Sequence, residues 1–472
     1  MERIETDICV IGAGSGGLSV AAGAVQMGAR VVLIEAGEMG GDCLNSGCVP
    51  SKALIAAAKA AEAQRSGAQF GVAPVKPEVD FGAVKDHVAA VIAQIAPVDS
   101  QERFEGLGVR VIRAFARFTG PREVEAGGYL VRARRFVIAT GSRPFVPPIP
   151  GVETVPYFTN ETIFAAREKP AHLIVIGGGP IGMEMAQAHR RLGSHVTVIE
   201  GAKALGREDP ELAEVVLTAL KEEGISLLEG QAVVRLSGFV GAVEVLLGDG
   251  TKVTGSHLLM AVGRKVSLEG MNLEAAGIAY SSKGITVGEN LRSTNRRVYA
   301  VGDTAGGLQF THVASYHAGI VVRQAVLGLP AKATMRAMPR ATYTAPELAQ
   351  VGMTEAEARA LHGAALTVVR ADFAHNDRAI TEGKAKGLIK VMIVEGRPLG
   401  ASIVGPQAGE LIALWALAIS SNLKMSAIAG MVAPYPTLGE VSKRAAGAYF
   451  SPKLFDNAAL KQLVRFVQKF VP

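Results

Sequence analysis

The residues best suited to chemistry in this chain are Cys43 and Cys48, which four residues separate in the segment GGDCLNSGCVPSK. Lys52 closes the segment, and an alanine-rich stretch that predicts a helix follows it. Cys48 stands just before the expected first turn, where free backbone N–H groups stabilise a thiolate. Cys43 is close enough in sequence to open or close a disulfide with it. The segment predicts a redox-active pair, and a reduced structural pair is the alternative.

The composition limits the classes of protein to consider. The chain has 472 residues, enough for about three domains, and its 49% hydrophobic content and 55 glycines fit an α/β fold. Three cysteines are too few for a secreted disulfide scaffold, and a net charge of +6 without a strongly basic block indicates no nucleic-acid partner. The N-terminus lacks a basic leader, and the apolar stretch 411–419 is too short to span a bilayer. We therefore expect a cytoplasmic protein without membrane insertion.

A nucleotide-binding pattern precedes the cysteines. A short apolar strand leads into Gly12, Gly14 and Gly17, and the next strand ends at Glu35. The first glycine allows a tight turn, the second lets the backbone approach a pyrophosphate, and the third lets helix and strand pack closely. Glu35 is positioned to accept hydrogen bonds from a ribose. Because strand, helix and acid accompany the glycines, the pattern predicts a dinucleotide site.

The same pattern recurs at Gly177, Gly179 and Gly182, with its acid at Glu200. The first glycine precedes the acid by the same number of positions in both copies. Two chance matches with one spacing are improbable, so the sequence predicts two dinucleotide cofactors, one for each unit.

Glu200 also indicates which nicotinamide nucleotide is used. A carboxylate at this position binds a ribose 2′-hydroxyl and repels a 2′-phosphate, which favours NADH over NADPH. Lys203 and Arg207 lie just downstream and soften that exclusion, so NADPH stays possible.

Together, a flavin-type fingerprint, a Cys-x4-Cys pair and a second fingerprint resemble the class I pyridine nucleotide–disulfide oxidoreductases. This group includes dihydrolipoamide dehydrogenase, glutathione reductase and mercuric reductase. Thr140 and Gly141 match the family's ATG segment, Gly263 the end of its nicotinamide domain, and Asp303 the acid that contacts the flavin's ribityl chain. Val313 stands in a stretch that runs under the flavin in the family. The resemblance implies that these residues bind FAD and NAD(P)H.

The resemblance also implies an architecture. Two Rossmann-like dinucleotide-binding domains of α/β type are expected, followed by an α+β dimerisation domain. Residues 1–150 and 280–335 would bind FAD, residues 151–279 would bind NAD(P), and residues 336–472 would form the interface of a homodimer. In such a dimer the C-terminal arm of one subunit completes the site of the other.

In this family a hydride passes from the nicotinamide to the flavin, and two electrons then pass to the disulfide. By resemblance, Cys48 is the sulfur next to the flavin and Cys43 is the thiol that attacks the substrate. Lys52 and Glu184 match an ion pair beside the flavin's reactive nitrogen. The cation favours the reduced anionic flavin, and the glutamate compensates for burying it.

One family motif is altered at the C-terminal end. Relatives that reduce disulfides carry His-Pro-Thr-x-x-Glu, whereas this chain has Tyr435 in place of the histidine and keeps Glu440. A phenol with a pKa near 10 is a poor proton relay at pH 7, and losing a general acid–base typically costs about 10²- to 10⁴-fold in rate. His312, His317 and His375 are the histidines considered as substitutes, and His312 is expected to be anchored to the backbone.

Mercuric reductases also carry a tyrosine at this position, but they deliver the metal with a C-terminal cysteine pair that this chain lacks. We therefore expect a small-molecule or protein disulfide or thiol as the substrate. Reduction of a metal ion or a quinone is the second interpretation, and an FAD-binding redox sensor with little turnover is the third.

Overall fold

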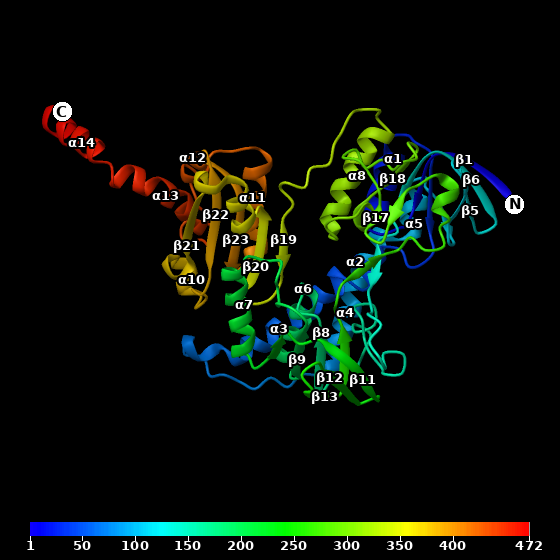
Figure 1. The fold of residues 1–472 in the computed structure, drawn as a ribbon, viewed down its shortest axis with the longest axis horizontal. Coiled ribbons are helices and arrows are strands. Elements are labelled where there is room, and N and C mark those ends of the chain that lie inside the picture. Colours follow the sequence, from blue (N-terminus) through cyan, green and yellow to red (C-terminus); the bar gives the residue numbers. More distant parts are fainter. Residues whose placement is uncertain (472) are drawn as a thin grey trace.

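The computed structural model describes residues 1–471, which form three units built around large sheets (Figure 1). The first sheet has seven strands in the order β3-β2-β1-β6-β5-β4, with β18 beside β6. β1, β2, β3, β6 and β18 are parallel, whereas β4 and β5 form an antiparallel extension. The strand bounds are β1 Glu2–Ile11, β2 Val31–Glu35, β3 Arg110–Arg113, β4 Arg117–Gly120, β5 Glu123–Ala126, β6 Tyr129–Ile138 and β18 Val298–Ala300.

Two helices distant in sequence pack together on this sheet. α1 (Ser15–Gln26) and α8 (Thr311–Ala325) contribute Leu18, Ala21 and Val321 to one buried core with the strands. The small residues of α1 permit this close packing, as at Gly23, where an added Cβ would lie 3.1 Å from Val322. The later chain therefore returns to complete the first unit, as a parallel sheet with crossover helices requires.

The return to the first unit begins earlier than residue 280, the predicted boundary. Val266, Leu268 and Met271 are buried in a core with strands of the first sheet. β15 (Arg264–Val266) also pairs with β7 (Ser142–Pro144), where the chain leaves the first unit. The packing therefore puts residues from about 266 with the first unit.

The second unit repeats the arrangement with a four-stranded parallel sheet in the order β10-β9-β8-β14. A three-stranded antiparallel sheet, β11-β12-β13, lies beside it. The elements are β8 His172–Ile176, α6 Pro180–Arg191, β9 His195–Glu200, α7 Pro210–Glu222, β10 Ser226–Glu229, β11 Val233–Phe239, β12 Ala242–Leu247, β13 Lys252–Gly255 and β14 His257–Met260.

A helix from the first unit covers the second one. α3 (Cys48–Arg65) packs against α4 (Phe81–Ile95) and α6, and Leu54 and Ala58 share a buried core with Met183 and other α6 residues. The start of α3 is thereby fixed between the two nucleotide-binding units.

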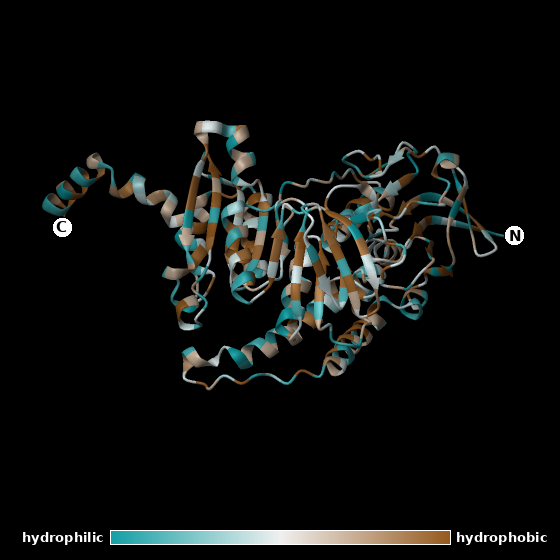
Figure 2. Cartoon of the chain, turned by 60° about the horizontal axis from the view of Figure 1, so that its bottom comes forward, coloured by the Kyte–Doolittle hydropathy of each residue, from teal (hydrophilic) through white to brown (hydrophobic). Residues whose placement is uncertain are grey.

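The third unit is a five-stranded antiparallel sheet in the order β19-β20-β23-β22-β21. Its central strands are largely hydrophobic (Figure 2), and Trp415 is buried with its indole N–H donating to Ser442 at 3.1 Å. The elements are β19 Arg340–Thr342, β20 Glu347–Gly352, α9 Glu355–His362, β21 Thr367–Asp372, α10 Asp377–Thr381, β22 Leu388–Val394, β23 Arg397–Gly405, α11 Ala408–Ser420, α12 Met425–Ala429, α13 Glu440–Phe455 and α14 Ala458–Phe470.

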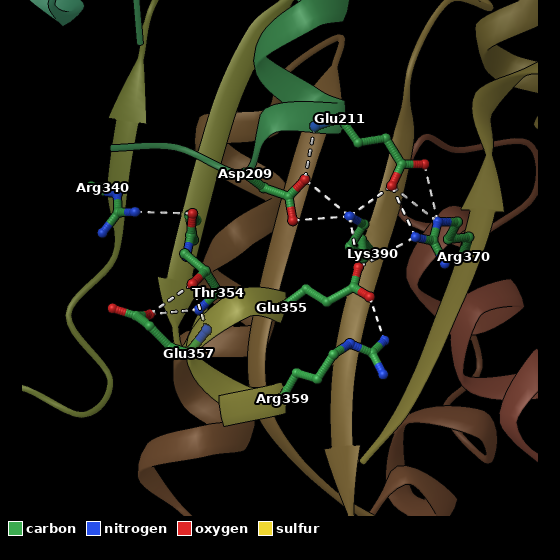
Figure 3. A network of polar contacts seen from close by, with 10 residues as sticks. Asp209, Glu211, Arg340, Thr354, Glu355, Glu357, Arg359, Arg370 and Lys390 are labelled. Atoms are coloured by element: carbon green, nitrogen blue, oxygen red, sulfur yellow. Dashed lines mark hydrogen bonds and ion pairs between the residues drawn. The ribbon is translucent and has the colours of Figure 1, made fainter. Parts of the chain in front are cut away.

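A buried ionic network joins the second and third units (Figure 3). The Lys390 side chain, 4% exposed, lies 2.9 Å from Asp209, 2.6 Å from Glu211 and 2.9 Å from Glu355. Arg370 contacts both glutamates from the neighbouring strand. Lys390 and Asp209 are both buried, so removing either would leave a buried charge without its partner. The network therefore holds the start of α7 against the third sheet.

The predicted fold class is confirmed: two Rossmann-like units and a C-terminal α+β unit. Within residues 1–471, none of the helices combines the length and apolarity needed to cross a bilayer.

Candidate active site

A hollow of about 670 Å³ opens at the carboxyl ends of the first sheet's strands and reaches the start of α6. It brings together most of the residues that the sequence singled out in the first unit. Those at its wall are Gly12, Gly14, Glu35, Cys43, Cys48, Lys52, Thr140, Gly141, Glu184 and Asp303.

The three glycines of the first fingerprint differ in their surroundings. A Cβ added at Gly17 would lie 1.8 Å from the Gly12 carbonyl oxygen, and one at Gly12, whose φ is +105°, would lie 2.4 Å from the Ala139 oxygen. At Gly14 the nearest atom would be 3.9 Å away, so the space above its backbone is free. Gly12 and Gly17 are thus required for close packing of the backbone, and Gly14 leaves room for a ligand.

The second fingerprint has the same geometry. A Cβ at Gly182 would lie 2.0 Å from the Gly177 oxygen, whereas nothing comes within 4 Å of one at Gly179. The two acids also match: Glu35 accepts a hydrogen bond from the Ala13 N–H, and Glu200 accepts one from the Gly178 N–H at 2.7 Å. Each acid receives a second bond from the N–H two positions later.

The cysteines lie on two short consecutive elements. Cys43 belongs to α2 (Gly41–Asn45) and Cys48 is the first residue of α3, with its sulfur 3.3 Å from the Thr311 hydroxyl. A hydrogen bond from the Cys43 thiol lowers the pKa of Cys48 to about 6, and Thr311 and the Lys52 charge add to this effect while burial opposes it. The same bond, together with burial, raises the pKa of Cys43. In the reduced pair the proton stays on Cys43 and Cys48 is the thiolate.

This asymmetry predicts a pH dependence. A thiol with a pKa near 6 is largely ionised at pH 7, so alkylation of the reduced enzyme should rise with a midpoint near pH 6 and not near 8.5, the ordinary cysteine value. Peptide mapping by mass spectrometry should find the label on Cys48. Buried Cys9, whose pKa burial raises, serves as the unreactive control. A midpoint above pH 8 would contradict the assignment.

Lys52 and Glu184 meet across the contact between α3 and α6. Lys52 Nζ lies 2.8 Å from Glu184 Oε2, and the glutamate side chain is only 6% exposed. The other carboxylate oxygen accepts the Tyr343 N–H at 2.9 Å, and the ammonium group lies 4.4 Å from the centre of the Tyr343 ring. The carboxylate is therefore held by two donors, and Lys52 is fixed at the wall of the hollow.

A polar cluster that the sequence did not predict surrounds Asp303. Ser142 donates to Asp303 at 2.5 Å and accepts from Arg264 at 2.7 Å, and Arg264 pairs with Asp42 at 3.1 Å. Asn160 donates to Asp42 at 3.0 Å. Burial raises the pKa of Asp303, while Ser142 and Arg264 oppose that effect. The sequence signals for the cluster are Asp303 itself and Arg264, which directly follows Gly263 in a family motif.

Val313 and Gly263 are among the predicted cofactor residues that do not line the hollow. Val313 is fully buried, and its neighbours Thr311, His312 and Ala314 reach the wall instead. Gly263 has a φ of +127° at the end of the second sheet and accepts a hydrogen bond from the Phe145 N–H at 2.9 Å. Gly263 therefore lies in the turn that connects the second unit to the first.

Tyr435 and Glu440 also lie outside this hollow. The Tyr435 side chain is 72% exposed, and its hydroxyl donates to Asp377 at 2.9 Å, which raises the pKa of the phenol. Glu440 begins α13 and accepts from the Thr437 N–H at 3.4 Å. Within one chain, Tyr435 is therefore hydrogen-bonded to Asp377 and not to Glu440.

Of the three histidines considered as substitutes, two are committed elsewhere. His312 Nε2 lies 2.8 Å from the Pro339 oxygen, so it is anchored to the backbone as predicted. Buried His317 accepts the Gly302 N–H and steadies the loop that carries Asp303. His375 is exposed and precedes Asp377 by two residues.

Comparisons with known proteins agree with this geometry. Residues 6–318 match the family model described as pyridine nucleotide-disulphide oxidoreductase, and residues 338–446 match its dimerisation domain. Dihydrolipoyl dehydrogenase of Thermus scotoductus is 37% identical over 94% of this chain and 97% of its own. Mercuric reductase of Streptomyces lividans is 34% identical over 94% of this chain and 96% of its own.

Among solved structures, the Cu(II) complex of the HOCl-induced flavoprotein disulfide reductase RclA from Escherichia coli aligns with a TM-score of 0.84 and 28% identity. The alignment covers 93% of this chain and 99% of that one. LpdA from Mycobacterium tuberculosis aligns with a TM-score of 0.85 and 26% identity, over 95% and 99% of the two chains.

The residues of the hollow fit FAD. The free space at Gly14 suits a pyrophosphate, the Glu35 carboxylate suits a ribose, and the wall continues to Asp303 and Cys48. The matching geometry at Gly179 and Glu200 suits the nicotinamide nucleotide. The chain thus belongs to the pyridine nucleotide-disulphide oxidoreductases, as an FAD-dependent enzyme that oxidises NAD(P)H and acts on disulfide or related acceptors.

Proposed function

We propose that this enzyme uses NADH to reduce a disulfide through the Cys43–Cys48 pair. The observation that carries the proposal is the position of Cys43 and Cys48 together at the wall of the hollow, in the same cavity as the Lys52–Glu184 ion pair. The pKa of Cys48, lowered to about 6, supports it. Perturbed ionisation of a nucleophile in a cleft is typical of a catalytic site.

Bound FAD would accept a hydride from the nicotinamide and supply two electrons to the sulfur pair. Reduction of the Cys43–Cys48 disulfide takes up those electrons and one proton, giving the Cys43 thiol and the Cys48 thiolate. Cys43 then attacks the acceptor disulfide as a thiolate, its proton passes to the acceptor sulfur that leaves, and a mixed disulfide remains. Cys48 displaces the second acceptor sulfur, and the Cys43–Cys48 bond forms again.

Lys52 has an electrostatic role in this proposal. Its ammonium group stabilises the Cys48 thiolate and would stabilise negative charge on a ring bound beside it. Glu184 keeps Lys52 oriented and compensates for its partial burial, since two hydrogen bonds hold the carboxylate in turn.

Glu200 favours NADH in this proposal. Its carboxylate is oriented by two backbone N–H groups beside the second glycine loop, where a 2′-phosphate would meet a fixed negative charge. Lys203 and Arg207 are exposed nearby and reduce the discrimination against NADPH.

A homodimer and a cytoplasmic location complete the proposal. The dimerisation domain supports the pairing, and it would bring Tyr435 and Glu440 to the partner's sulfur pair. Tyr435 stays protonated at neutral pH and cannot accept a proton there, because its hydrogen bond to Asp377 raises the pKa of the phenol. The acceptor is therefore one whose leaving thiol needs little help with protonation.

Mercury is a less suitable acceptor than a disulfide. Apart from the redox pair, the chain has only Cys9, which is buried inside β1. Within residues 1–471, no group of three or more His, Cys, Asp or Glu side chains is arranged to hold a metal. Relatives named mercuric reductase therefore do not by themselves determine the acceptor here.

The test is an acceptor screen with NADH and NADPH on wild type and two variants. We expect turnover with disulfides, faster with NADH. Tyr435→His should raise lipoamide turnover at least about tenfold, since a relay histidine is typically worth about 10²- to 10⁴-fold. Tyr435→Phe is the matched control, because it removes the hydroxyl without adding a base and should bring no gain. Turnover confined to quinones and unaffected by alkylation of the cysteines would refute the proposal.

A further inference from the structure

The last helix, α14, has no buried residue in the described chain. It follows α13 and extends away from the third unit (Figure 1), beyond residue 446 where the dimerisation domain ends. Asn457 caps its start by accepting the Leu460 N–H at 3.1 Å. Because α14 adds no side chain to a core of this chain, its sequence must serve a purpose other than packing within the chain.

The side chains of α14 are separated by type around the helix axis. At 100° per residue, its apolar side chains other than Ala458 occupy one continuous arc, and its charged and amide side chains occupy the opposite one. Phe466 and Phe470 are 58% and 62% exposed, and their ring centres lie 4.8 Å apart. The apolar arc holds Ala459, Leu460, Leu463, Val464, Phe466, Val467 and Phe470, and the polar arc holds Lys461, Gln462, Arg465, Gln468 and Lys469.

The charge of this part of the chain has one sign. The segment from 441 to 472 carries six lysines and arginines against a single acid, Asp456, although the whole chain has a formal charge of only +6. The polar arc of α14 carries only basic charges. A helix that docks on another protein has no general need of a uniformly basic outer face, whereas one lying on an anionic bilayer does.

We propose that α14 binds the surface of membranes rich in anionic phospholipids. Its apolar arc would lie at the boundary between head groups and acyl chains, with Lys461, Arg465 and Lys469 against the phosphates. The helix has 13 residues, too few to cross a bilayer, so attachment is peripheral. In a homodimer the two copies would bind together and strengthen the attachment.

Flotation of the FAD-loaded full-length enzyme with vesicles tests this proposal. We expect binding to phosphatidylcholine vesicles that contain phosphatidylglycerol, little binding to phosphatidylcholine alone, and release by salt. Replacing Lys461, Arg465 and Lys469 together by glutamine should weaken binding about 100-fold, because each basic residue near an anionic surface contributes about fivefold. Phe466→Ser with Phe470→Ser should also abolish it.

Two surface variants are matched controls. Phe239→Ser removes an aromatic ring on the second unit that is even more exposed, at 70%, and Lys386→Gln removes an exposed charge elsewhere. Both should bind vesicles like wild type, and every variant should keep its flavin absorbance. Equal binding to both vesicle types, or none, would overturn the proposal. A third result would also overturn it: wild type does not bind vesicles, and light scattering shows that the Phe466→Ser, Phe470→Ser variant is a monomer. The apolar arc of α14 would then be a contact between subunits.

Discussion

Cys48→Ser is expected to bind FAD and accept a hydride from NADH but to reduce disulfide acceptors about 10³-fold more slowly or worse. Serine preserves the start of α3 and its contact with Thr311, while the sulfur that closes the redox bond is lost. Stopped-flow absorbance separates the two half-reactions, flavin reduction by NADH and re-oxidation by the acceptor. The first should keep its rate and the second should fail.

Cys43→Ser should give the same loss of acceptor turnover, because the bond needs both sulfurs. It should also raise the pKa of Cys48, since the hydrogen bond from Cys43 is the largest cause of the low value. Cys9→Ser is the control: its sulfur is buried in β1, and turnover should be unchanged. Undiminished disulfide reduction by Cys48→Ser would remove the sulfur pair from the electron path.

The second large effect is expected when the third glycine of each fingerprint is replaced by alanine. Gly17→Ala would bring a Cβ within 1.8 Å of the Gly12 oxygen, and Gly182→Ala within 2.0 Å of the Gly177 oxygen. Relieving either clash by displacing the glycine loop costs up to about 3 kcal/mol, which would lower nucleotide affinity by up to about 100-fold. Gly17→Ala should therefore purify without flavin. Gly182→Ala should stay yellow yet be reduced by NADH only at far higher nucleotide concentrations.

Gly179→Ala is the control for this pair. No atom lies within 4 Å of the added methyl group, so the fold should be untouched and only the approach of the nucleotide should suffer. Flavin content by absorbance and thermal unfolding distinguish these cases. If Gly17→Ala retained flavin and Gly182→Ala kept the affinity of wild type for NADH, the two glycine loops would not be the cofactor sites.

The features that could be predicted from sequence are the ones encoded locally. Each fingerprint places its glycines, helix and acid within one strand–helix–strand unit, so the turn at Gly12 and the hydrogen bond to Glu35 follow from neighbouring residues. The redox pair is likewise contained in one short segment at the start of α3.

The features that could not be predicted depend on distant parts of the chain. Thr311 reaches Cys48 across 263 positions, and Asp42 meets Arg264 from another unit. The bond between Tyr435 and Asp377 joins positions 58 residues apart. No periodicity or spacing signals such contacts, because they arise only when segments far apart in the chain pack together. The chain returns at Val266 and not at residue 280 for the same reason, since this return depends on packing against the distant first sheet.

Counting thiols tests most directly whether electrons leave through the sulfur pair. The chain has three cysteines, and only Cys9 should be free in the oxidised enzyme. After denaturation the oxidised enzyme should titrate one thiol per chain, and enzyme first reduced anaerobically by NADH should titrate three. One thiol both before and after NADH would mean that the cysteines take no electrons, and three before NADH would mean that they form no disulfide; either result would contradict the account.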